Sequence, residues 1–129
     1  MTPTLEPLVL VVDDYRDSRE MYAECLQGYG FRVAEASNGF EALTLAGSLS
    51  PDVILMDLSL PGIDGWEATR QLKADARTRH IPIVALTGHA GRTAAEAARK
   101  AGCAAFVVKP ALPEQIVLEV KKVLDTPAG

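Results

Sequence analysis

Five polar residues that could do chemistry together stand where apolar runs of the chain end. Asp13 and Asp14 follow Leu8–Val12, Asp57 closes Val53–Asp57, Thr87 follows residues 81–86, and Lys109 follows Ala105–Val108. Apolar runs of four or more residues without polar alternation indicate strands buried on both faces, as in a parallel sheet covered by helices. Ligands bind at the carboxyl ends of such strands, so we expect all five side chains at one edge of a sheet.

These residue types favour phosphoryl chemistry with a divalent cation. Two carboxylates about 4 Å apart repel each other by roughly 1 to 4 kcal/mol, so three of them need compensation. One lysine leaves a formal charge of −2 on the group. Mg²⁺ suits that charge because it prefers oxygen ligands, including carboxylates and water. The Thr87 hydroxyl and the Lys109 ammonium then suit an anionic group, for which phosphoryl fits best.

Helix signals lie between the apolar runs. The N-cap spacing of a helix start occurs three times, as Asn38 with Glu41, Asp64 with Glu67, and Thr93 with Glu96. Gly102 is suited to end a helix and Pro113 to begin one. Residues 31–36 alternate enough to form an edge strand. Strict strand–helix alternation predicts an α/β fold, a doubly wound parallel (βα)5 sheet with right-handed crossovers.

A first helix is expected between residues 16 and 28, ended by the glycines at 28 and 30. Its predicted core-facing stripe consists of Met21, Tyr22, Cys25, Leu26 and Tyr29. Cys25 is therefore predicted to be structural. A last helix is expected to bury Ile116, Val117, Val120 and Leu124.

Composition excludes several classes of protein. A length of 129 residues predicts one domain, and 17 acidic against 13 basic residues argue against direct nucleic-acid binding. Cys25 and Cys103 lack metal-ligand spacing, which disfavours a zinc site and favours a reducing compartment. Neither a signal sequence nor an apolar run of roughly 20 residues is present, so we expect a cytoplasmic protein that does not enter a membrane.

With the Leu-Pro-Gly that begins at Leu60 and the Lys109–Pro110 pair, this ordered set resembles the receiver domain of two-component response regulators. The resemblance covers residues 8–124 and treats 1–129 as a single receiver domain with short free tails. It implies a flavodoxin-like five-stranded sheet in the order 2-1-3-4-5. Whether the domain stands alone or was excised from a larger regulator stays open, as does its oligomeric state.

The resemblance also assigns roles. Asp57 is expected to accept a phosphoryl group from the phosphohistidine of a sensor histidine kinase or a histidine phosphotransfer protein. Asp14 is expected to bind Mg²⁺ directly, Asp13 mainly through water, and Ser59 through its backbone carbonyl. Lys109 and Thr87 are expected to contact the phosphoryl group, and Lys109–Pro110 to be cis. The domain is thus expected to catalyse only its own phosphorylation and dephosphorylation.

The expected output runs through Thr87 and Phe106. An aromatic residue at this position switches rotamer in the resembled family, and Phe106 lacks the hydroxyl that a tyrosine has there. The domain is expected either to signal to an unidentified target protein, through the surface made by the fourth helix, the fifth strand and the fifth helix, or to relay the phosphoryl group onward. His89 is expected to be an ordinary solvated loop side chain.

Two other classes fit the residues less well. A Mg²⁺-dependent aspartyl phosphohydrolase would need Asp-x-Asp after the first strand, where position 15 is Tyr15, and would need a cap domain. A flavodoxin-like FMN carrier would need a phosphate-binding loop at the same place. Asp13 and Asp14 would repel that phosphate.

Overall fold

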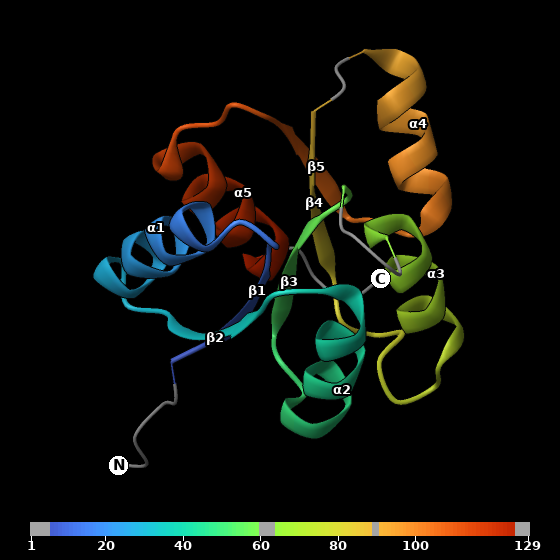
Figure 1. The fold of residues 1–129 in the computed structure, drawn as a ribbon, viewed down its shortest axis with the longest axis horizontal. Coiled ribbons are helices and arrows are strands. Elements are labelled where there is room, and N and C mark those ends of the chain that lie inside the picture. Colours follow the sequence, from blue (N-terminus) through green and yellow to red (C-terminus); the bar gives the residue numbers. More distant parts are fainter. Residues whose placement is uncertain (1–5, 60–63, 89–90, 126–129) are drawn as a thin grey trace.

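The computed structural model describes residues 6–59, 64–88 and 91–125, in which five strands alternate with five helices (Figure 1). The strands are β1 (Leu8–Val12), β2 (Arg32–Ala36), β3 (Val53–Asp57), β4 (Ile83–Thr87) and β5 (Ala105–Val108). The helices are α1 (Arg16–Gly28), α2 (Gly39–Leu49), α3 (Gly65–Ala74), α4 (Arg92–Ala101) and α5 (Pro113–Asp125). All strand pairs are parallel, in the order β2-β1-β3-β4-β5. The predicted doubly wound α/β fold and its strand order are confirmed.

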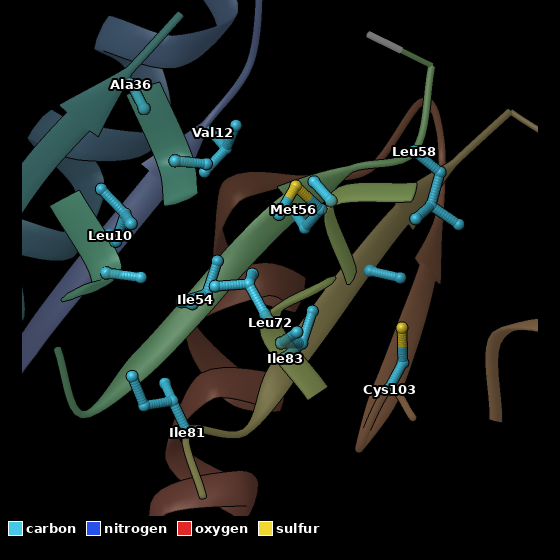
Figure 2. Close-up of a cluster of buried hydrophobic side chains, with 14 of the residues drawn as sticks. Leu10, Val12, Ala36, Ile54, Met56, Leu58, Leu72, Ile81, Ile83 and Cys103 are labelled. Atoms are coloured by element: carbon cyan, nitrogen blue, oxygen red, sulfur yellow. The ribbon is translucent and has the colours of Figure 1, made fainter. Parts of the chain in front are cut away.

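Helices cover both faces of the sheet, with α1 and α5 on one face and α2, α3 and α4 on the other (Figure 1). Successive residues of a strand point to opposite faces, which splits the core into two clusters. Leu10, Ile54 and Ile83 pack toward α2 and α3 (Figure 2). Val9, Leu55 and Val84 pack toward α1 and α5. The uninterrupted apolar runs of the sequence therefore reflect burial on both sides.

The strand register places the carboxyl ends together at one edge. Val12 of β1 pairs with Met56, Asp57 pairs with Leu86, and Thr87 pairs with Val108. Two backbone hydrogen bonds continue beyond the strands, from Leu58 N to Leu86 O at 2.9 Å and from Lys109 N to Thr87 O at 2.7 Å. The residues that follow the strands are thereby fixed close to the sheet.

Two of the three predicted helix caps are confirmed. The Asn38 side chain accepts a hydrogen bond from Glu41 N at 2.9 Å, and the Asp64 side chain accepts one from Glu67 N at 2.7 Å. The prediction for Thr93 is wrong, because α4 begins at Arg92 after an N-cap at Gly91 that makes no side-chain hydrogen bond. Gly91 has φ of 107°, which glycine adopts readily, so the chain turns into the helix before Thr93 is reached.

Other differences concern element ends and exposure. β4 begins at Ile83 and not at residue 81, because Pro82 has no N–H to donate to the ladder. Met21 and Tyr29 are 43% and 51% exposed, whereas α1 buries Tyr22, Ala23 and Leu26. Met21 lies beside the buried stripe.

Tyr29 lies at the C-cap of α1, beyond its last turn, and its ring is covered by Lys121 Nζ, 5.0 Å from the ring centroid. Cys25 is partly buried against the α1–α5 side of the core, as predicted, and Cys103 is buried. Both are free thiols. In α5, the predicted apolar face is buried at Ile116, Val117 and Val120, while Leu124 is partly buried against it.

Candidate functional site

Three carboxylates converge where β1 and β3 end. Asp13, Asp14 and Asp57 each offer an oxygen, and these oxygens all lie within 4.8 Å of one another. Asp13 and Asp57 are almost fully buried, at 1% and 2% exposure, whereas Asp14 is exposed. The convergence inferred from the ends of the apolar runs is therefore present, and it concentrates negative charge on two buried carboxylates beside the exposed Asp14.

Asp57 uses both carboxylate oxygens. Oδ2 accepts a hydrogen bond from Lys109 Nζ at 2.8 Å, and Oδ1 accepts one from Ser59 N at 2.9 Å. Burial alone would lower the pKa of Lys109, but the hydrogen bond and charge of Asp57, together with the charge of Asp13, raise that pKa. The Lys109 ammonium is thus held charged against Asp57. The Lys109–Pro110 peptide bond is cis, as the resemblance implies.

Asp13 is fixed through three of its polar groups. Its N–H donates to Ala36 O at 3.1 Å, its Oδ1 accepts from Tyr15 N at 2.9 Å, and its carbonyl accepts from Arg19 Nη1 at 2.9 Å. Burial raises the pKa of Asp13, the Tyr15 N–H opposes that effect, and the Asp57 charge adds to it. Asp13 Oδ2 is buried and has no hydrogen-bond partner among the described residues.

This donor set fits a small divalent cation. A buried carboxylate oxygen without a partner carries a desolvation cost that an added ligand can remove. Magnesium prefers oxygen ligands and keeps several waters, which the exposed side of the cluster at Asp14 leaves room for. Ser59 is exposed, and its N–H donates a hydrogen bond to Asp57, which places Ser59 next to the carboxylate cluster. The role of its carbonyl as a metal ligand stays a prediction.

The two predicted switch residues lie at different depths. Thr87 is 4% exposed and ends β4, one residue beyond the Leu86 that pairs with Asp57. Phe106 lies in β5, partly buried against the core that faces α2 to α4. It borders a hollow of about 170 Å³ that is also lined by Ala95, Ala98 and Arg99 of α4. Thr87 therefore belongs to the carboxylate edge, whereas Phe106 lies between β5 and α4.

Sequence reasoning missed two residues that shape the site. A Cβ at Gly65 would meet the carbonyl oxygen of Asp57 and the Cα of Leu58, so only glycine lets α3 start against the end of β3. Arg19 reaches from α1 to the Asp13 carbonyl. Glycine directly after the Asp64 cap was a signal for the first, but nothing local in the sequence indicates the second. His89 and the Leu-Pro-Gly at 60–62 lie outside the described residues.

Comparison with known proteins places this geometry in a family. A family model described as the response regulator receiver domain matches residues 9–121. The polar-differentiation response regulator DivK of Brucella anthropi is 35% identical over 116 residues, which cover 90% of this chain and 94% of that protein.

Solved structures agree with the sequence comparisons. The chemotaxis response regulator CheY4 of Vibrio cholerae is 30% identical with a TM-score of 0.87, covering 92% of this chain and 98% of that one. The receiver domain of the sensor histidine kinase PA1611 from Pseudomonas aeruginosa, with a magnesium ion in its active-site cleft, is 29% identical with a TM-score of 0.85. That match covers 94% of this chain and 99% of that one. These findings support neither a phosphohydrolase nor an FMN carrier.

Proposed function

The chain belongs to the receiver-domain family of response regulators in two-component signalling, and from that premise we propose that Asp57 accepts the phosphoryl group. One observation carries the assignment. Asp57 is the carboxylate that contacts Lys109, at 2.8 Å, inside the cluster it forms with Asp13 and Asp14. The nucleophile thus lies in contact with a compensating cation, and its acidic partners lie within 4.8 Å of it.

The reaction needs positioning and charge compensation more than acid–base chemistry. A carboxylate oxygen of Asp57 attacks the phosphorus of a phosphohistidine in line with the P–N bond. The O–P bond forms, the P–N bond breaks, and its electron pair stays on the histidine nitrogen, which takes up a proton. The Lys109 ammonium compensates charge on the phosphoryl oxygens, and the Thr87 hydroxyl hydrogen-bonds one of them.

A bound metal ion belongs to this proposal. Asp13, Asp14 and Asp57, with the carbonyl of Ser59, would hold Mg²⁺, Asp13 mainly through water. When bound, the ion neutralises charge that develops on the transferring group. The chain's own contribution is to hold the three carboxylates together and to fix Asp13 through the hydrogen bonds that Tyr15 N and Arg19 Nη1 donate to it.

The proposal extends to partners. The donor is a phosphohistidine on a sensor histidine kinase or a histidine phosphotransfer protein, and the output is a target protein that docks on the face of α4, β5 and α5. Residues 8–124 act as one receiver unit within 1–129 and catalyse only their own phosphorylation and dephosphorylation. We place the protein in the cytoplasm, without direct contact to nucleic acid or membrane. None of the helices in the described residues is long and apolar enough to cross a bilayer.

Mass spectrometry after incubation with Mg²⁺ and acetyl phosphate tests the assignment. The wild type should gain one phosphoryl group, and Asp57→Asn should gain none. Asp75→Asn is the matched control, because Asp75 is an acid paired with Arg77 in the turn after α3, away from the carboxylate cluster, and it should be labelled like the wild type. Equal labelling of Asp57→Asn and wild type would contradict the proposal.

A further inference from the structure

We propose that Arg19 is a positioning residue for the metal site, acting through the backbone of Asp13, and that Glu35 orients its guanidinium. This inference rests on the proposed function. Arg19 Nη1 donates to the Asp13 carbonyl at 2.9 Å, while Arg19 Nε donates to Glu35 Oε1 at 3.1 Å. One planar guanidinium thereby joins α1, β2 and the turn that carries Asp13 and Asp14.

The contact is held more tightly than a surface ion pair. The Arg19 side chain is 16% exposed, against 78% for Arg16 in the same helix. Two different nitrogens make the two bonds at once, which fixes the plane of the guanidinium, a geometry that a lysine cannot reproduce. Glu35 is 40% exposed and lies on the edge strand, so its carboxylate is anchored by the sheet.

The Asp13 carbonyl is the third anchor of a residue otherwise fixed through its N–H and Oδ1. Without the Arg19 side chain, Asp13 keeps its hydrogen bonds with Ala36 O and Tyr15 N among the described residues. The Asp13 carboxylate then samples more orientations relative to Asp14 and Asp57. Groups that orient metal ligands from behind typically change metal affinity by about 10- to 100-fold when they are removed.

Two other roles for Arg19, a purely structural one and a purely electrostatic one, lead to different expected results. The guanidinium borders a polar hollow of about 490 Å³, also lined by Arg16, Glu20 and Glu41. Shortening the side chain therefore opens no apolar cavity, and the folded state should survive its loss. Charge alone also gives a distinct result, because removing a cation near three carboxylates should tighten Mg²⁺ binding, whereas lost positioning should weaken it.

The sign of the change in Mg²⁺ affinity therefore tests the proposal. Isothermal titration calorimetry with MgCl₂ should show that Arg19→Gln binds Mg²⁺ about tenfold more weakly than wild type. Arg16→Gln is the matched control. Arg16 lies one turn before Arg19 and forms an exposed ion pair with Glu20, so the substitution removes the same charge and should not weaken Mg²⁺ binding. Arg19→Lys and Glu35→Gln should fall between wild type and Arg19→Gln, because each keeps part of the contact.

Several outcomes would overturn the proposal. A folded Arg19→Gln with wild-type or tighter Mg²⁺ binding overturns the proposal, as does equal weakening in Arg16→Gln. If Arg19→Gln does not fold, Arg19→Lys and Glu35→Gln take its place, and wild-type affinity in both overturns it. A wild type that binds no Mg²⁺ and accepts no phosphoryl group overturns the proposed function itself. A wild type that does both, beside an unaffected Arg19→Gln, overturns only the role of Arg19.

Discussion

The ammonium of Lys109 lies 2.8 Å from Asp57 Oδ2, so a residue that follows β5 contacts the last residue of β3 across the end of β4. Asp57 is 3% exposed in its side chain and Lys109 is 32% exposed. The pair neutralises a carboxylate that would otherwise be buried beside Asp13. A divalent cation would compensate the same charge, which makes Lys109 and metal partly redundant in stabilising the fold.

Lys109→Met should therefore make the stability of the protein depend more strongly on metal than that of the wild type does. Removing one partner of a buried pair costs about 3 to 5 kcal/mol, and the partial exposure of Lys109 puts the expected loss near the lower limit. Mg²⁺ should bind more tightly than to wild type, because the site keeps three carboxylates and loses its cation. Urea unfolding with EDTA and with excess MgCl₂ measures both effects.

Asp14→Asn is the matched opposite, since it removes one repelling charge from the exposed side of the cluster. Without metal, its free energy of unfolding should exceed that of the wild type by at most about 1 kcal/mol, and it should bind Mg²⁺ more weakly. If Lys109→Met and Asp14→Asn shift metal-free stability in the same direction, repulsion among the carboxylates does not limit the stability of the protein.

Gly65→Ala should damage the site without touching a charged group. An added Cβ would meet the backbone of Asp57 and Leu58 and lie 2.8 Å from the Asp57 carbonyl carbon. Backbone cannot move aside as a side chain can, so we expect a loss of about 1 to 3 kcal/mol and slower phosphorylation by acetyl phosphate.

The control for that substitution is Gly28→Ala, at the last residue of α1. Among the described residues, no atom outside the neighbouring residues and the backbone of α1 itself lies within 4 Å of a Cβ there. It should be neutral or stabilise by about 0.4 to 1 kcal/mol, with normal phosphorylation. Wild-type stability in Gly65→Ala would show that α3 can shift away from Asp57.

The contrast between Asp57 and Arg19 shows what the sequence could predict. Asp57 was identified because an apolar strand leads directly to it, and parallel strands must end at a common edge. Arg19 was missed because its contact depends on how α1 lies over β2, which local spacing does not encode. The predicted cap at Thr93 was wrong for a different reason. The Thr-x-x-Glu pattern is present, but Gly91 is the N-cap and the helix begins at Arg92. Contacts among residues at strand ends, such as Lys109 with Asp57, could be predicted, whereas the contact that a helix side chain makes with a neighbouring loop could not.

The buried thiol of Cys103 should make the folded protein less stable at alkaline pH. Burial raises the pKa of Cys103 to about 11, with Lys73 opposing, and a thiol in an unfolded chain ionises near 9. Between those values the unfolded chain has released a proton that the folded chain retains. Stability is therefore fully present below pH 9 and falls as pH rises toward 11, by about 2 to 3 kcal/mol for a shift of this size.

Cys103→Ala isolates that effect. The variant loses packing at every pH, but its stability should decline less steeply than that of wild type between pH 9 and 11. Burial also lowers the pKa of Lys73, which works in the opposite direction, and the charge of Cys103 opposes that shift. The difference between the two curves therefore measures Cys103 together with its interaction with Lys73. Parallel curves in urea unfolding with reductant would contradict the prediction.

The helix α4 is expected to move when Asp57 is phosphorylated. This helix buries only Ala98 fully among its described residues. It is flanked by an open groove of about 630 Å³ toward α3 and by the hollow of about 170 Å³ next to Phe106. A helix whose buried side chain is a small alanine, with space on both sides, can shift at low cost. A phosphoryl group that attracts the Thr87 hydroxyl should therefore displace α4 and β5.

Amide chemical shifts on adding Mg²⁺ and beryllofluoride should therefore change in residues 92–108 as well as at the carboxylate cluster. Trp66, the single tryptophan of the sequence, lines the groove between α3 and α4, so its fluorescence should change as well. A complete switch from 1:99 to 99:1 needs about 5.5 kcal/mol of differential binding, and Phe106 rests on packing without a hydroxyl. We therefore expect a partial shift. Asp57→Asn should show neither signal, and shifts confined to α1 and α2 would place the output elsewhere.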